Sequence, residues 1–198
     1  GVRASAGAEM KRVYLIRHGL TEGNRLRRYI GRTDEPLCAA GRAALSAAPL
    51  KGIETVYVSP LLRARETAAI LFPHARQIVV DGLREMDFGA FENRSADDMK
   101  NDAAYRAWVD GLCEGDCPGG ENRCGFVART VRAFENICAA GGDDPLVIVA
   151  HGGTVMALMS ELGEPKKDYW AWHVGAGGCL RCALDGGRLL YEGDGFDA

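Results

Sequence analysis

The run Leu-Val-Ile-Val-Ala at 146–150 is the segment that most restricts how this chain can fold. An uninterrupted apolar run of this length is typical of a strand that a parallel sheet buries on both faces. Shorter runs rich in β-branched and aromatic residues stand at 13–16, 55–59 and 78–80. Because parallel strands need long crossover connections, usually helices, these runs predict an α/β fold.

Helical patterns lie between the predicted strands. They cover 39–48, 61–72, 95–111 and 154–162, and a further helix is marked by Val127, Val131, Phe134 and Cys138. At the end of the chain, 178–192 reads as two strands joined by a turn at 185–187, whereas the pattern at 168–173 does not choose between a helix and an irregular segment. We therefore expect a three-layer sandwich, with a mostly parallel central sheet and helices on both faces.

The length of 198 residues fits one domain of ordinary size. We expect this domain to cover 10–198, with a lid segment at 95–124 inside it. Residues 1–9 are small, polar and aperiodic, and Met10 begins the patterned sequence. We expect residues 1–9 to be a disordered extension.

Composition excludes several classes of protein. Hydrophobic residues make up 47% and charged residues 26%, which is typical of a globular protein, and no apolar run has the ~20 residues that a membrane span needs. The net charge of −3 argues against a protein whose main partner is nucleic acid or an anionic membrane. A small-molecule partner is therefore expected, and the chain fits a monomer or a homodimer.

The seven cysteines, with no secretory signal ahead of them, favour a reduced, cytoplasmic protein. A structural zinc site is the alternative, because Cys179 and Cys182 form a C-x-x-C. On one strand, however, these two side chains point to opposite faces, which argues against shared ligation. We expect no metal and no cofactor.

Two histidines directly follow predicted strands. Arg17-His18-Gly19 comes after the first strand, and His151-Gly152-Gly153 comes after the run at 146–150. Ligand sites in open parallel sheets lie outside the carboxyl ends of the strands. One such histidine alone is more often structural, but two flanked by glycines, whose backbone can approach a ligand closely, favour one shared pocket.

Two further residues fit such a pocket. Arg63 falls in the first turn of a helix that begins at the end of a strand, where a guanidinium and free backbone N–H groups make an anion site. Glu85 follows the third strand in an apolar setting, and a carboxyl there would have a raised pKa and could donate a proton. Taken alone, each could equally be a solvated surface residue.

Four segments together resemble the signatures of the histidine phosphatase superfamily, the phosphoglycerate mutase-like "RHG" enzymes. They are LIRHGLTEGN (15–24), SPLLRARETA (59–68), LREMDFGAFE (83–92) and VAHGG (149–153). The resemblance implies that His18 is the nucleophile that becomes phosphohistidine and that Glu85 is the general acid and base. It also implies a phosphate site made by Arg17, Arg63, His151, Asn24 and Gly152, without a metal.

Where the family pattern has a threonine after Pro-Leu, this chain has Cys38, so we expect the next helix to lack its N-cap oxygen. Only about forty residues separate Glu85 from the helix near Phe126, less than in the family's phosphoglycerate mutases. A smaller cap admits water, which favours a phosphatase over a mutase.

Within the superfamily, the stretches 85–95, 105–108 and 172–179 are similar to the alpha-ribazole phosphatases of cobalamin biosynthesis. Such a substrate needs a flat apolar wall, for which Tyr105, Trp108, Trp170 and Trp172 are candidates. These aromatic residues could instead simply pack the lid segment onto the sheet.

A phosphatase of broad specificity or a phosphoglycerate mutase is the alternative. A non-catalytic phosphate-binding regulator would be expected to lose the nucleophile or the acid, and both are present. A metal protein ligated by His18 and His151 is disfavoured, because Arg17 and Arg63 would repel a cation.

Overall fold

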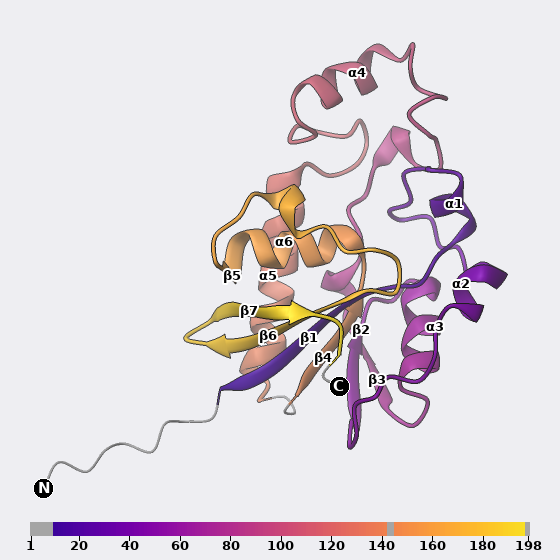
Figure 1. The fold of residues 1–198 in the computed structure, drawn as a ribbon. Coiled ribbons are helices and arrows are strands. Elements are labelled where there is room, and N and C mark those ends of the chain that lie inside the picture. Colours follow the sequence, from indigo (N-terminus) through magenta and orange to yellow (C-terminus); the bar gives the residue numbers. More distant parts are fainter. Residues whose placement is uncertain (1–9, 142–144, 197–198) are drawn as a thin grey trace, which may run out of the picture.

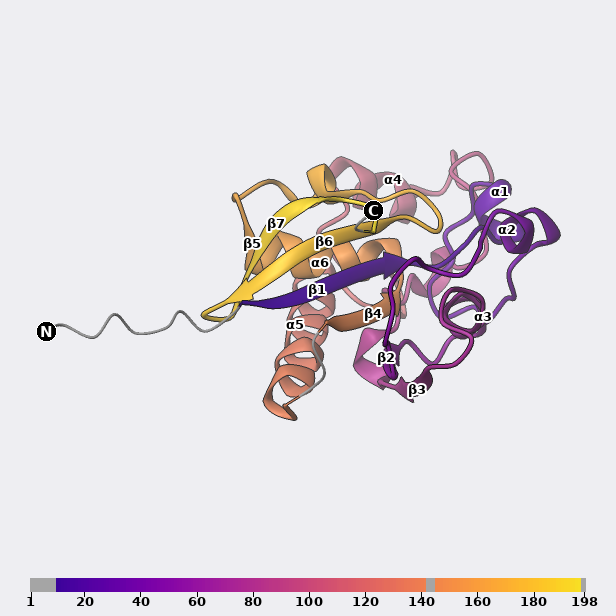
Figure 2. The ribbon, with the colours of Figure 1, turned by 60° about the horizontal axis from the view of Figure 1, so that its bottom comes forward.

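The computed structural model describes residues 10–141 and 145–196, and the predicted extension at 1–9 lies outside this part of the chain. Seven strands form one sheet in the order β3-β2-β4-β1-β6-β7-β5 (Figure 1). The strands are β1 (Lys11–Arg17), β2 (Thr55–Val58), β3 (Arg76–Val79), β4 (Leu146–Ala150), β5 (Gly163–Glu164), β6 (Cys179–Asp185) and β7 (Arg188–Asp194). β1, β2, β3 and β4 pair in parallel, and β6 runs antiparallel between β1 and β7 (Figure 2). The mostly parallel sheet is therefore confirmed.

Helices cover both faces of the sheet. The α-helices are α1 (Glu22–Arg25), α2 (Ala39–Ala43), α3 (Leu62–Leu71), α4 (Ala103–Asp110), α5 (Arg123–Ala139) and α6 (Gly152–Leu162). Short 3-10 turns form η1 (Asp81–Leu83), η2 (Gly89–Phe91) and η3 (Tyr169–Trp172). The apolar cluster on one face includes residues of α5 and α6, and the cluster on the other face includes residues of α3. The predicted three-layer sandwich is confirmed.

Alternation along the central strands explains the two cores. In β1, Val13 and Leu15 pack on the α5–α6 side, and Tyr14 and Ile16 pack on the α3 side. Every residue of β4 is buried, as its continuous apolar sequence predicts. The two cysteines of the C-x-x-C in β6 also lie on opposite faces of the sheet, because Cys182 packs on the α5–α6 side and Cys179 on the α3 side. The prediction that these two thiols point to opposite faces is confirmed.

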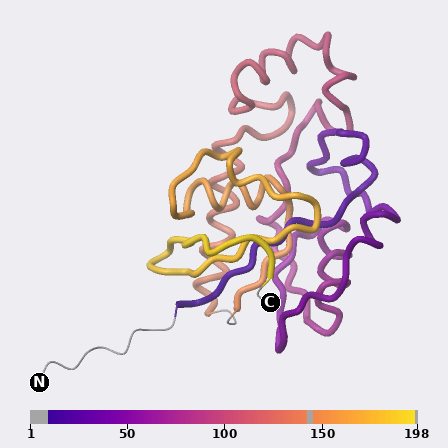
Figure 3. The backbone as a smooth tube through the Cα atoms, in the orientation of Figure 1, coloured from indigo at the N-terminus to yellow at the C-terminus, as the bar shows by residue number. Residues whose placement is uncertain are grey.

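The segment 95–124, for which the sequence predicts a lid, leaves the sheet layer and returns to α5 at one end of the molecule (Figure 3); we call it the lid segment. The predicted helix over 95–111 is wrong in its first half, because the helix begins only at Ala103. Asp102 caps that helix by accepting hydrogen bonds from the N–H groups of Ala104 and Tyr105. Before it, Ser95 and Asp98 bond each other's backbone and form turns instead.

Two expectations around α2 are corrected. The helix ends at Ala43 rather than near residue 48, because the chain turns away and Ala48 donates its N–H to Leu71 at the end of α3. The cap is also present, since the sulfur of Cys38 accepts the N–H of Gly41 at 3.3 Å in place of an oxygen. In the described part of the chain, no helix is both long and apolar enough to cross a membrane.

Candidate active site

The carboxyl ends of three neighbouring parallel strands bring the candidate residues together. His18 follows β1, Ser59 follows β2 and His151 follows β4. Backbone hydrogen bonds continue the sheet pairing one residue further, from the N–H of His18 to Ala150 and from the N–H of Ser59 to Val149. The rings of His18 and His151 consequently lie edge to face, with their centroids 5.2 Å apart.

His18 is held as a neutral imidazole with one nitrogen free to react. Its Nδ1 lies 2.6 Å from the carbonyl oxygen of Gly19, and because a carbonyl can only accept, Nδ1 carries the proton. Burial, reinforced by the charges of Arg63 and Arg17, lowers the pKa of His18 to about 3. The lone pair of a neutral ring therefore resides on Nε2 across the pH range in which most enzymes work.

Two arginines are fixed by backbone carbonyls rather than by carboxylates. Arg63 is fully buried and donates from its terminal nitrogens to Thr33 at 2.7 Å and to Gly31 at 2.9 Å. Arg17 donates to the carbonyl oxygen of Val174 at 2.6 Å, and its Nη1 also lies 3.3 Å from Nε2 of His173. The carbonyls orient these guanidinium groups without carrying a charge that would pair with them, so the arginines stay available to an anion.

His151 completes the group. It is fully buried, and its Nε2 lies 2.7 Å from the hydroxyl of Ser59. That hydroxyl also accepts the N–H of Leu61 at 3.4 Å. When the hydroxyl donates its own proton to Nε2, the ring proton of neutral His151 lies on Nδ1. Burial together with the charge of Arg63 keeps the pKa of His151 well below its ordinary value.

Three buried nitrogens of this group have no hydrogen-bond partner among the described residues. They are Nε of Arg17, Nε of Arg63 and Nδ1 of His151. Buried donors are almost always satisfied in folded proteins, so three unsatisfied ones around a neutral histidine are an unusual concentration. A ligand with several acceptor oxygens and a negative charge would satisfy all three.

Glu85 lies beside this group, on the chain that leaves η1. Its carboxylate accepts the N–H of Gly153 at 3.0 Å and of Met86 at 2.9 Å. Burial raises the pKa of Glu85, and these two hydrogen bonds and the nearby arginines oppose that rise only in part. A Cβ at position 153 would lie 2.1 Å from the Glu85 carboxylate, so only glycine at the start of α6 lets the carboxylate approach.

A cavity of about 270 Å³ opens from the charged group toward the lid segment. Arg17, Glu85, Gly152 and Gly153 line its inner end. The outer walls are mainly aromatic, from Tyr29, Phe88, Trp108, Tyr169 and Trp170. Such a cavity fits a ligand with an anionic end and a flat, largely apolar body.

The family model described as "Histidine phosphatase superfamily (branch 1)" matches residues 13–192. The chain belongs to the histidine phosphatase superfamily. The resemblance seen in the sequence is therefore confirmed, and with it a phosphatase or mutase activity on small phosphate esters.

The relatives of this histidine phosphatase differ in their names. The "Probable phosphoglycerate mutase GpmB" of Serratia proteamaculans is 36% identical over 166 residues, which cover 79% of this chain and 77% of that protein. The "Putative phosphoserine phosphatase 2" of Hydrogenobacter thermophilus is 32% identical and covers 92% of this chain and 95% of its own length. Among solved structures, the alpha-ribazole phosphatase from Shigella flexneri superposes with a TM-score of 0.79 at 25% identity, covering 91% and 94% of the two chains. The names span a mutase and two kinds of phosphatase, so the substrate has to be argued from the site.

The histidine phosphatase site holds most of the residues that the sequence singles out. Of these residues, Arg17, Glu85, Gly152 and Trp108 line the cavity, whereas His18, Arg63 and His151 are buried and do not line it. Asn24 and Tyr105 do not line the cavity either. Asn24 pairs with Thr21 in the capping box of α1, through its backbone N–H at 3.2 Å and its Oδ1 at 3.4 Å. Tyr105 lies behind Tyr29, and their hydroxyls are 2.8 Å apart.

Other cavity residues are absent from the sequence prediction. They include Tyr29, Phe88, Tyr169, Arg123 and His173. Phe88 and His173 fall inside stretches that carry the family resemblance, and this resemblance could have indicated them as site residues. Nothing comparable in the sequence indicates Tyr29 or Arg123. Of the four predicted wall residues, Trp108 and Trp170 line the cavity, whereas Trp172 is buried against Tyr191. In the part of the chain that the structure describes, no group of three or more His, Cys, Asp or Glu side chains could hold a metal ion.

Proposed function

We propose that this protein is a metal-independent phosphomonoesterase that works through a phosphohistidine on His18, with alpha-ribazole 5′-phosphate as its substrate. One observation carries the reaction type: a neutral, buried His18 stands among three buried nitrogens without partners, and Glu85 lies close by. A phosphoryl group in transfer spreads negative charge over three oxygens, and preorganised donors stabilise it.

In the first step, Nε2 of His18 attacks phosphorus and the bond from phosphorus to the ester oxygen breaks. Nδ1 keeps its proton and continues to donate it to the carbonyl oxygen of Gly19, so the ring gains the phosphoryl group without losing its orientation. Arg17, Arg63 and His151 hold the phosphoryl oxygens. Because its pKa is raised, Glu85 is available in the protonated form and gives its proton to the leaving alkoxide.

In the second step, a water molecule attacks the phosphorus of phospho-His18. Glu85, now a carboxylate, takes a proton from that water, the bond between nitrogen and phosphorus breaks, and inorganic phosphate leaves. His18 and Glu85 return to their starting protonation states. The same carboxyl thus serves as acid and then as base.

The aromatic walls support the choice of substrate. A benzimidazole nucleoside is flat and uncharged, and five aromatic side chains line the cavity at its outer end. Phosphoglycerate and phosphoserine would instead place a carboxylate there. The one arginine of the outer wall, Arg123, is already paired with Glu114 at 3.3 Å. The cytoplasm is the proposed location, since none of the seven cysteines forms a disulfide among the described residues.

Phosphate release from a panel of esters tests the proposal. The panel contains alpha-ribazole 5′-phosphate, 3-phosphoglycerate, phosphoserine, a sugar phosphate and p-nitrophenyl phosphate, with EDTA present throughout. We expect turnover with a clear preference for alpha-ribazole 5′-phosphate and none by His18→Ala. Even turnover across the panel would favour a broad-specificity phosphatase. Transfer from 3-phosphoglycerate to its 2-isomer would favour a mutase, and phosphate binding without any turnover would leave a binding protein.

A further inference from the structure

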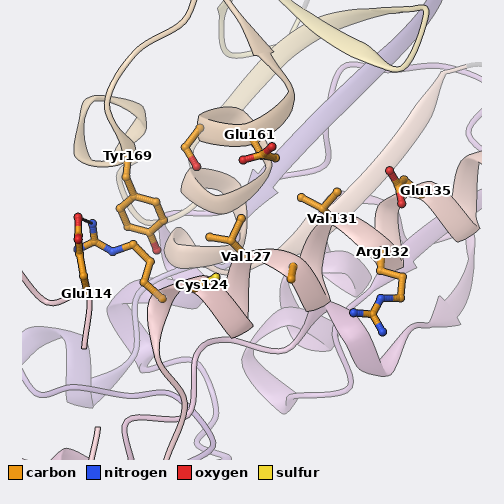
Figure 4. Close-up of a pocket in the computed structure, with 11 residues that line it drawn as sticks. Glu114, Cys124, Val127, Val131, Arg132, Glu135, Glu161 and Tyr169 are labelled. Carbon is orange, nitrogen blue, oxygen red and sulfur yellow. Dashed lines mark hydrogen bonds and ion pairs between the residues drawn. The ribbon is translucent and has the colours of Figure 1, made fainter. Parts of the chain in front are cut away.

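A second cavity adjoins the active-site cavity. It is a groove of about 750 Å³ between α5 and α6, with Val127, Ala128 and Val131 among its lining residues. Figure 4 shows Tyr169 and Glu114 at one end of this groove and Arg132 and Glu135 at the other. Together with Tyr169, Arg123 lines both the groove and the active-site cavity. These two side chains therefore form a wall that the two spaces share.

Arg123 is held in this wall from several sides. Its guanidinium carbon lies 4.6 Å from the centre of the Tyr169 ring and 5.0 Å from that of Trp170. Its terminal nitrogens pair with Glu114 and donate to the carbonyl oxygen of Leu112. The side chain is only 14% exposed, unlike an ordinary surface arginine. Stacking on two rings and bonding two residues of one loop fix the planar group in one place.

The loop that Arg123 holds belongs to the lid segment and is conformationally costly. Leu112 and Cys113 are consecutive residues with φ of 58° and 59°, in the left-handed region that residues other than glycine rarely adopt. Cys113 lines the active-site cavity. By bonding the carbonyl of Leu112, Arg123 ties this strained loop to η3 across the mouth of the cavity. The bulk of Arg123 and Tyr169 together thus bounds the cavity on the side of the groove.

We propose that Arg123 is a specificity-determining residue that sets the size limit for the leaving group of the substrate. With Arg123 in place, a leaving group is confined to the aromatic cavity of about 270 Å³. Without it, the cavity opens into the groove between α5 and α6, and longer leaving groups fit. This inference rests on the proposed phosphomonoesterase function and adds to it the residue that selects among esters.

Two esters with matched chemistry test the size limit. Alpha-ribazole 5′-phosphate and riboflavin 5′-phosphate both release a primary alcohol, but the second carries a larger, three-ring body. The ratio of their kcat/KM values therefore reports fit rather than the chemical step. We expect Arg123→Ala to raise the ratio in favour of riboflavin 5′-phosphate by about tenfold or more, the size of effect that steric fit in an apolar pocket produces.

Matched variants separate bulk from charge and from general damage. Arg123→Met keeps most of the bulk and should keep the ratio within about threefold of the wild type. Arg132→Ala removes an arginine from the far end of the groove and should leave the ratio unchanged. Tyr169→Ala removes the other half of the wall and should shift the ratio in the same direction as Arg123→Ala. If Arg123→Ala does not fold, Tyr169→Ala tests the size limit in its place. A ratio unchanged in the folded wall variants, or the same shift in Arg123→Met as in Arg123→Ala, would overturn the size limit.

A binding measurement keeps this inference separate from the proposed function. Calorimetry with both esters is carried out on His18→Ala and on His18→Ala combined with Arg123→Ala. If the wild type hydrolyses neither ester, the phosphatase proposal fails, but a shift in the ratio of the two Kd values still supports Arg123 as the wall. If turnover occurs and the Kd ratio does not move, the size limit fails while the phosphatase proposal stands.

Discussion

Nε2 of His151 lies 2.7 Å from the hydroxyl of Ser59, while Nδ1 of the same buried ring has no hydrogen-bond partner among the described residues. The two residues follow neighbouring parallel strands, β4 and β2, so the sheet itself fixes their separation. The hydrogen bond between the two residues fixes the orientation of the imidazole and leaves Nδ1 open to a ligand. Ser59 is therefore a positioning residue for the phosphate site.

Replacing Ser59 by alanine tests this relationship. The substitution removes the hydrogen bond that orients the ring and leaves Nε2 of His151 buried without a partner, a change worth about 1–2 kcal/mol. We expect kcat/KM for phosphate release to fall roughly tenfold, with a smaller loss in affinity for inorganic phosphate, because Arg17 and Arg63 remain. Ser160→Ala, which removes a hydroxyl from α6 away from the strand ends, is the control. Equal activities of the two variants would contradict the positioning role.

The two buried imidazoles make stability depend on pH. Burial lowers the pKa of His18 to about 3 and that of His151 well below its usual value. In the unfolded chain both titrate near 6.5. Below that pH the unfolded state binds protons that the native state does not, so the full stability is present above pH 6.5 and decreases as the pH falls toward the native pKa.

Thermal unfolding measures this loss. For His18 alone, lowering the pH from about 7 to about 5 should cost about 2 kcal/mol, or roughly 4–8 °C in Tm. His18→Gln should lose correspondingly less Tm over the same interval, whereas His74→Gln, at an exposed position, should behave as the wild type does. Identical pH dependence in all three proteins would mean that the pKa of His18 in the native state is not lowered, and would contradict a ring that burial keeps neutral below pH 6.5.

The position of a residue at a strand end is a local property, and for that reason the sequence predicts the centre of the site well. His18 and His151 directly follow apolar runs whose strands pair in parallel, so the fold class alone brings them to one edge. Arg63 follows from the same logic, since it stands in the first turn of a helix that comes after a strand. These predictions needed no knowledge of distant contacts.

The residues of the outer walls of the cavity are placed by contacts between distant parts of the chain. The sequence alone therefore does not predict them. Tyr29 lies in an irregular segment, and backbone hydrogen bonds from its N–H to Arg94 and from Asn93 to its carbonyl place it. Nothing near Tyr29 in the sequence distinguishes it from Tyr105, which contacts it from behind. Asn24 is a residue that the sequence does single out. The family pattern gives it a role at the phosphate, whereas in the structure its Oδ1 takes part in the α1 capping box. Its contact with phosphate stays a prediction.

Glu85 as the general acid is tested by the leaving group. Poor leaving groups such as alkyl alcohols need protonation as they depart, whereas p-nitrophenolate hardly does. For Glu85→Gln we expect kcat/KM to fall about 100-fold or more with an alkyl phosphate, and much less with p-nitrophenyl phosphate. Because burial raises its pKa, Glu85 in the wild type should also keep its proton to a higher pH than an ordinary carboxyl. A uniform loss with both esters would point to damage of the site rather than to loss of an acid.

Gly153 gives the strictest geometric test of the site. Its N–H donates to Glu85 at 3.0 Å, and a Cβ at this position would lie 2.1 Å from the same carboxylate. Gly153→Ala must therefore displace either the start of α6 or Glu85, and we expect kcat to fall about 100-fold, as for a misplaced catalytic group. Stability should fall as well, by about 1–3 kcal/mol for overpacking in a buried place. Gly115→Ala, where a Cβ meets nothing within 4 Å, is the matched control and should change neither quantity. Full activity of Gly153→Ala would show that the carboxylate of Glu85 need not sit against α6 during the reaction, and would contradict the need for glycine at this position.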